Sequence, residues 1–130
     1  MHKILWTLLL AMMANILLTA CSSSTGDASA KAVENYLNAL VAKDENLVPT
    51  LVCGEWEEDA LIELDSFQAV TARLENVACS QTGTEGDTAL VNCTGSIVAT
   101  YNEEDQEIDL SHITYQVVEQ GGDWLVCGTR

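Results

Sequence analysis

The chain has 130 residues, with 20 acidic and 5 basic side chains, which gives a formal net charge of −15 at neutral pH. Such an acidic surface argues against nucleic-acid binding, because contacts with phosphate depend on Lys and Arg, and it disfavours lying flat on an anionic membrane. The length suffices for one domain with a modest core.

The first 20 residues are predicted to be a secretory signal peptide. MHKILWTLLLAMMANILLTAC has a short basic start with Lys3, an apolar stretch from Ile4 to about Leu18, and the ending LTAC. This ending resembles the bacterial lipobox, whose cysteine is diacylated and becomes the first mature residue. We therefore expect a lipoprotein that begins at Cys21 and is held in the cell envelope, on the extracytoplasmic side of a bacterial membrane. An uncleaved membrane anchor is the alternative, since roughly 18 apolar residues is the lower edge of a spanning helix.

A flexible tether is expected at residues 21–29, because SSSTGDAS after the cysteine shows no apolar periodicity. The folded domain then spans residues 30–130. It opens on a helix predicted from Ala30 to Lys43 and capped by Asp27 or Ser29. Apolar side chains at helical spacing mark the face that this helix buries: Val33, Tyr36, Leu37, Leu40 and Val41.

Two shorter helical segments are expected next. Pro49 forbids one regular helix through DENLVPTLVCG, so a short second helix or a turn is predicted there. A third helical stretch is predicted from about Glu55 to Asp65, where Trp56, Ala60 and Leu64 share one face. Acidic residues occupy its first turn, where negative charge suits the helix dipole.

Beyond Phe67 the apolar pattern changes to the period of two that is typical of strands. In the third predicted strand the apolar parity slips between Leu110 and Ile113, as a bulge would make it do. Helices followed by four successive strands with short turns predict an α+β domain with a four-stranded antiparallel meander. The predicted strands are residues 72–81, 88–101, 108–119 and 124–128.

Four cysteines remain besides the lipidated one: Cys53, Cys79, Cys93 and Cys127. An even number of cysteines in an exported chain favours disulfides. The competing interpretation is metal binding or redox catalysis by free thiols, but the sequence has no CxxC motif and no histidine at ligand spacing. Two disulfides are therefore predicted.

The meander selects one of the three pairings. Strands two and four are separated by strand three, so Cys93 and Cys127 should lie roughly 9 to 10 Å apart at about 4.8 Å per strand. That exceeds the limit of about 7 Å for a disulfide, and Cys79 would lie further still from Cys127. The remaining pairing joins Cys79 to Cys93 across a hairpin and Cys53 to Cys127 between the helical layer and the last strand. The hairpin cysteines fall about one residue off direct opposition, which a longer loop or a bulge would correct.

AKAVENYLNALVAKDENLVPTLVC resembles the opening helices of nuclear transport factor 2-like domains, as found in small bacterial lipoproteins, and GGDWLVC resembles their closing strand. The similarity covers roughly residues 30–127. It implies a cystatin-like cone, in which a strongly curved sheet wraps around the long helix and often leaves a pocket. Some members of this class are enzymes, such as ketosteroid isomerase and scytalone dehydratase, whereas many only bind or dimerise.

An enzyme of that type needs an acid–base pair inside the cone. The candidate residues are Asp65, His112, Tyr36 and Tyr115. None of them matches a position of a family motif, so the resemblance carries no catalytic role over to them. The simpler interpretation of His112 is a partly exposed strand residue, and that of Tyr36 is a core residue with its hydroxyl at an edge.

No metal and no cofactor are expected. The acidic clusters at residues 57–59 and 103–105 lack the alternating ligands and the glycine of a calcium loop. The sequence therefore predicts a lipid-anchored, non-enzymatic module that binds a small apolar ligand or a protein partner. The alternatives are a cofactor-independent lyase or isomerase acting in the cone cavity, and a structural module that forms a homodimer.

Overall fold

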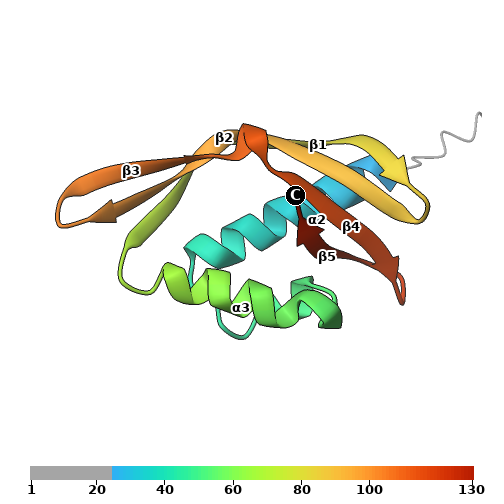
Figure 1. Ribbon diagram of the computed structural model, residues 1–130, viewed down its shortest axis with the longest axis horizontal. Helices are drawn as coiled ribbons and strands as arrows, with labels where there is room; N and C mark the ends of the chain where they lie inside the picture. Colours follow the sequence, from blue (N-terminus) through green and yellow to red (C-terminus); the bar gives the residue numbers. More distant parts are fainter. Residues whose placement is uncertain (1–24) are drawn as a thin grey trace, which may run out of the picture.

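The computed structural model of the protein describes residues 25–130. Two α-helices pack with a bent five-stranded antiparallel sheet, and α2 runs beneath the concave side of the sheet (Figure 1). The α+β class predicted from the sequence is confirmed. The predicted signal peptide and Cys21 lie outside the described residues. Within residues 25–130, no helix has both the length and the apolar character that crossing a membrane requires.

The long helix α2 spans Thr25–Val41, so it starts earlier than predicted. Asp27 and Ser29, the predicted caps, lie inside the helix instead. The fully buried hydroxyl of Ser29 donates a hydrogen bond of 2.9 Å to Oε1 of Gln81 on the sheet, which anchors this turn of the helix. Residues 25–29 of the predicted tether are therefore part of the folded domain.

Two 3-10 turns and one helix follow α2. Pro49 lies at the start of η1 (Val48–Leu51), which is the short second helix expected from the sequence. The turn η2 (Gly54–Trp56) leads into α3 (Glu57–Ser66). The predicted buried face of α3 is confirmed, since Ala60 and Leu64 are buried and Trp56 packs half-buried against the core.

Five strands form the sheet in the order β1-β2-β4-β5, and β3 also pairs with β2. The prediction of four strands is wrong, because the 3-10 turn η3 (Leu110–His112) interrupts the expected third strand near its start and the chain before η3 forms a further strand, β3. β3 and β4 both pair with β2, β3 with residues 96–101 and β4 with residues 88–92. The meander therefore persists. The strands are β1 (Thr71–Glu85), β2 (Thr88–Tyr101), β3 (Glu104–Asp109), β4 (Thr114–Gln120) and β5 (Asp123–Thr129).

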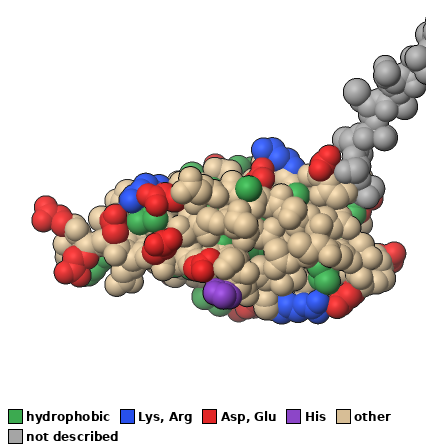
Figure 2. Space-filling view, turned by 90° about the horizontal axis from the view of Figure 1, so that it is seen from above, with side chains coloured by type: hydrophobic (Ala, Val, Ile, Leu, Met, Phe, Trp, Pro, Cys, Tyr) green, Lys and Arg blue, Asp and Glu red, His purple; other side chains and the backbone are tan. Residues whose placement is uncertain are grey.

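All six residues of β3 are exposed, so neither face of this strand requires apolar side chains, and its sequence does not alternate between apolar and polar residues. Residues 104–107 were expected to belong to the turn before the third strand, and only residues 108–109 to that strand. Instead Asn102 and Glu103, with φ of 50° and 68°, close a two-residue hairpin between β2 and β3. This hairpin projects from the body of the domain (Figure 1), and acidic side chains gather at the same end of the molecule (Figure 2).

The core lies between α2 and the concave side of the sheet, where side chains from both layers interlock. The helix contributes its predicted apolar face, including Tyr36, which is fully buried. The sheet contributes alternate residues of β2, β4 and β5, as the period of two requires. Among the largest fully buried side chains are Tyr36, Tyr115, Leu37, Leu40, Leu110 and Val117.

Both predicted disulfides are confirmed. Cys79 on β1 is paired directly with Cys93 on β2, and a register shift between Gln81 and Gly83 supplies the bulge that brings them level. Cys53 is bonded to Cys127, which attaches the segment between η1 and η2 to β5. The backbone N–H of Cys53 also donates to the carbonyl of the residue before Cys127, at 2.9 Å.

Candidate functional site

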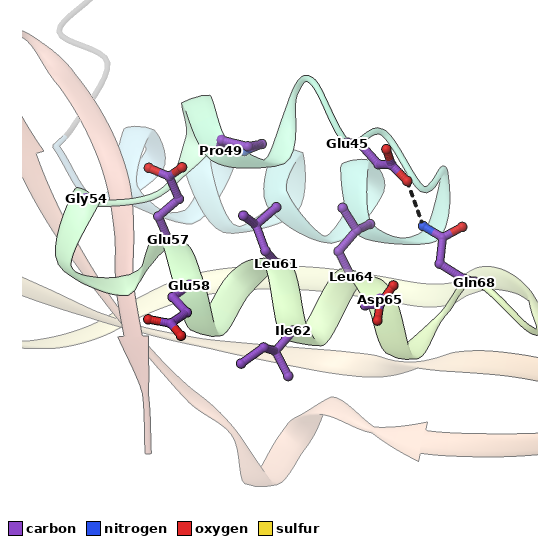
Figure 3. A pocket seen from close by; sticks show the side chains of 10 residues that line it. All are labelled: Glu45, Pro49, Gly54, Glu57, Glu58, Leu61, Ile62, Leu64, Asp65 and Gln68. Atoms are coloured by element: carbon purple, nitrogen blue, oxygen red, sulfur yellow. Dashed lines mark hydrogen bonds between the residues drawn. The ribbon is translucent and has the colours of Figure 1, made fainter.

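A groove of about 790 Å³ lies between α3 and the segment that contains η1 (Figure 3). Leu61 and Leu64 point from α3 toward Pro49 and form its apolar floor, whereas Ile62 points away from Pro49 and lines the groove from the solvent-exposed side of α3. Four carboxylates line the groove around these apolar side chains: Glu45, Glu57, Glu58 and Asp65.

Helical periodicity explains the arrangement of these side chains. Glu58, Ile62 and Asp65 recur at i, i+4 and i+7, so they form one stripe along α3. Glu57 and Leu61 begin a second stripe beside it. Leu61 is 38% exposed and Ile62 is 63% exposed, so two neighbouring large apolar residues face solvent between carboxylates.

The groove is strongly negative. Within the described residues, Lys31, Arg73 and Arg130 form ion pairs with carboxylates on α2, β1 and β3, and none of these carboxylates lines the groove. Glu45 accepts a hydrogen bond of 3.3 Å from the amide of Gln68, a neutral partner (Figure 3). No ion pair within residues 25–130 therefore joins a cation to a carboxylate of the groove.

A second group of polar side chains lies inside the domain. The hydroxyl of Tyr36 on α2 donates a hydrogen bond of 2.6 Å to Oε2 of Glu63 on α3. Burial raises the pKa of Glu63, and the hydrogen bond from Tyr36 offsets this only in part. Burial, followed by the charge of Glu63, raises the pKa of Tyr115. The ring of Trp56 packs against Tyr36 with centroids 5.5 Å apart.

This cluster of the buried Tyr36 and Tyr115 and the half-buried Glu63 contains the groups that general acid–base catalysis uses, a carboxyl whose pKa is raised and two phenols. The groove beside α3 and two further concavities of the described surface are nevertheless lined by other side chains. In this structure the hydrogen bond between Tyr36 and Glu63 joins α2 to α3.

The structure brings together only two of the four candidate residues. Tyr36 and Tyr115 are both in the cluster with Glu63, whereas Asp65 is exposed and lines the groove. His112 lies in η3 rather than in a strand, and its side chain is 85% exposed and 3.5 Å from a carboxylate oxygen of Asp109.

Glu63 was not among the residues that the sequence predicted for the site. The signal was present, because Glu63 is three residues after Ala60 and seven after Trp56, and both of these belong to the buried face of α3. A carboxylate on an otherwise apolar face needs a polar partner, and Tyr36 on the opposing helix supplies it.

Glu63 should make the stability of the domain depend on pH. Because its pKa is raised by folding, the folded chain keeps this proton from about pH 4.5 upward, where the unfolded chain releases it. The stabilising contribution is therefore fully present below about pH 4.5 and is lost as the pH rises through the raised pKa. Urea unfolding from about pH 4.5 upward measures the effect. The free energy of unfolding of Glu63→Gln should not show this decline with pH, so the variant should become increasingly stable relative to wild type as the pH rises.

Tyr36→Phe provides the opposite control. It removes the hydrogen bond that lowers the pKa of Glu63, so the decline in stability should extend to higher pH. Stability curves of wild type and Glu63→Gln that stay parallel over the whole range would contradict this account.

Comparison of the sequence with models of known protein families gives no match, and comparison with curated proteins gives none either. The fold is similar to the solution structure of a SEC-C motif containing protein from Rhodopseudomonas palustris. The two chains are 12% identical, the similarity covers 79% of each, and the TM-score is 0.52. At this identity the similarity concerns the fold alone. The described residues contain no group of three or more His, Cys, Asp or Glu side chains that could hold a metal ion.

Proposed function

We propose that the protein is a lipid-anchored binding module of the bacterial cell envelope that docks a protein partner in the groove of α3. The observation that carries the proposal is the pair of exposed apolar side chains, Leu61 and Ile62, set among carboxylates that form no ion pair within residues 25–130. Exposed large apolar residues with a polar rim are typical of interaction surfaces. The module is non-enzymatic, and its domain is of the nuclear transport factor 2-like type.

Three features support the location and the fold type. The sequence ending LTAC at Cys21 follows an apolar segment of signal-peptide length. The two disulfides suit an oxidising compartment outside the cytoplasm. A bent sheet over the long helix α2 is the arrangement that the family resemblance implies (Figure 1). Because α2 begins at Thr25, only residues 22–24 would separate the folded domain from the lipid.

A protein partner suits the groove better than a small apolar ligand. Pockets for small ligands enclose most of the ligand surface. Here Leu61 and Ile62 point to different sides of α3 and are both exposed, so an occupant has to cover the outside of a helix (Figure 3). The concave side of the sheet, where a ligand of a cone-shaped domain was expected, is packed with core side chains.

Site-directed photo-crosslinking of the full chain in its native membranes tests this proposal. A photo-reactive phenylalanine replaces Ile62, and the matched control replaces Ile108 on β3, which is 41% exposed. The protein should sediment with the membranes, and Cys21→Ser should release it. Position 62 should give one defined adduct with a second protein, and position 108 should not. No adduct at position 62, or the same adduct at both positions, would refute docking at the groove.

A further inference from the structure

We infer that the occupant of the α3 groove is a cationic amphipathic segment of a partner protein, in which an apolar side chain lies between basic ones. This inference rests on the proposed function and specifies the chemistry of the partner.

The spacing defines what the segment must present. Glu58 and Asp65 are seven residues apart on α3, which is about 10 Å at 1.5 Å per residue, and Ile62 lies between them. A partner helix places side chains at the same separation when they are two turns apart. The matching segment therefore carries two basic residues about two turns apart and an apolar residue between them.

The charges exclude partners of other kinds. The chain has a net charge of −15, and within residues 25–130 no ion pair joins a cation to Glu45, Glu57, Glu58 or Asp65. An acidic or neutral occupant would cover these carboxylates without compensating for their lost hydration. A basic segment would pair with them, and the field of the whole domain would increase its rate of association.

The apolar side chains and the carboxylates of the groove contribute differently to binding of the partner. Single exposed ion pairs contribute little to affinity, so the carboxylates mainly select and orient the partner. Burial of Leu61 and Ile62 supplies the favourable apolar contact, because both side chains retain area that a partner can cover. Either group of side chains alone would give a weaker or a less selective site.

Peptide binding to the full-length protein in zwitterionic phosphatidylcholine nanodiscs tests the inference, with empty nanodiscs as the blank. The probe is a fluorescent alanine-based helix of about 15 residues with a leucine flanked by lysines two turns apart. Its matched control has glutamates in place of the lysines. The lysine peptide should bind, more weakly as salt increases, and the glutamate peptide should not.

Two double variants separate the groove from net charge. Glu58→Gln with Asp65→Gln should weaken binding of the lysine peptide by about threefold to tenfold. Glu104→Gln with Glu107→Gln removes the same charge from β3, where both residues are exposed, and should change the dissociation constant by less than about twofold. Unchanged urea midpoints would show that each variant is folded. Equal losses in both double variants, or equal binding of the glutamate peptide, would overturn the inference.

The crosslinking assay distinguishes failure of the inference from failure of the proposed function. If the adduct at position 62 persists in the Glu58→Gln and Asp65→Gln background, a partner docks in the groove without these charges, and only the inference fails. If position 62 gives no adduct in an otherwise wild-type chain, the proposed function itself fails. Loss of the adduct only in the double variant supports both.

Discussion

Replacing Cys53 and Cys127 together by alanine should lower the free energy of unfolding by about 4 kcal/mol. The two cysteines are 74 residues apart in sequence, so their disulfide closes a long loop and removes much of the conformational entropy of the unfolded chain. The same treatment of Cys79 and Cys93, which are 14 residues apart, should cost about 3 kcal/mol. Urea unfolding of both double variants under oxidising conditions measures the difference.

The two disulfides also differ in what they hold. The pairing of β1 with β2 continues along the chain before and after Cys79 and Cys93, so the sheet should survive the replacement of these cysteines. Cys53 is held to β5 mainly by the disulfide, one backbone hydrogen bond and the isolated bridge between Val52 and Val126. Amide exchange in η2 and α3 should therefore rise in the Cys53→Ala, Cys127→Ala variant. A larger loss of stability in the hairpin variant would contradict this ranking.

Gly95→Ala should destabilise the domain by about 3 kcal/mol, because it adds both strain and overlap. Gly95 has φ of 88°, and a Cβ atom there would lie 2.5 Å from the carbonyl oxygens of Glu75 and Asn76 on β1. Both are backbone atoms, so they cannot move aside as a side chain would. The position lies at a register shift between β1 and β2, near the point where the partner of β2 changes from β4 to β3.

Gly83→Ala is the matched control for this prediction. Gly83 lies at the other register shift of the same strand pair, and its added Cβ atom would meet only Leu90 Cδ1, at 3.7 Å. Its effect should stay within about 1 kcal/mol of wild type in either direction. Thermal and urea unfolding compare the two variants. Similar small effects at both glycines would contradict the strain and overlap expected at Gly95.

Local patterns in the sequence predicted most of the fold. The spacing of apolar residues predicted α2, α3 and β2, and the proline predicted η1. The disulfide pairing followed from a simple distance argument, because cysteines on strands that are not neighbours lie too far apart to bond. The bulge needed to align Cys79 with Cys93 is present between Gln81 and Gly83.

Where both sides of an element face solvent, the sequence pattern was uninformative. β3 is a strand of exposed polar and charged residues whose pairing depends on the backbone of β2 and on a hairpin turn with positive φ at Asn102 and Glu103. Its composition alone resembles a loop. The parity slip at Leu110–His112 was visible, but only the three-dimensional path shows that the chain turns there and then continues along the same neighbour.

The sequence by itself determined the acidic charge, the α+β order and the cysteine pairing. Charge and order depend on composition and on local patterns, and the pairing followed because the predicted strand order placed Cys127 too far from Cys79 and Cys93. Only the tertiary structure decided which candidate residues meet. It placed Glu63 against Tyr36 across two helices, left His112 and Asp65 outside the core, and exposed Leu61 and Ile62 beside η1. Contacts between distant segments depend on how the layers pack, and helical or strand periodicity gives the face of a residue without naming what lies opposite it.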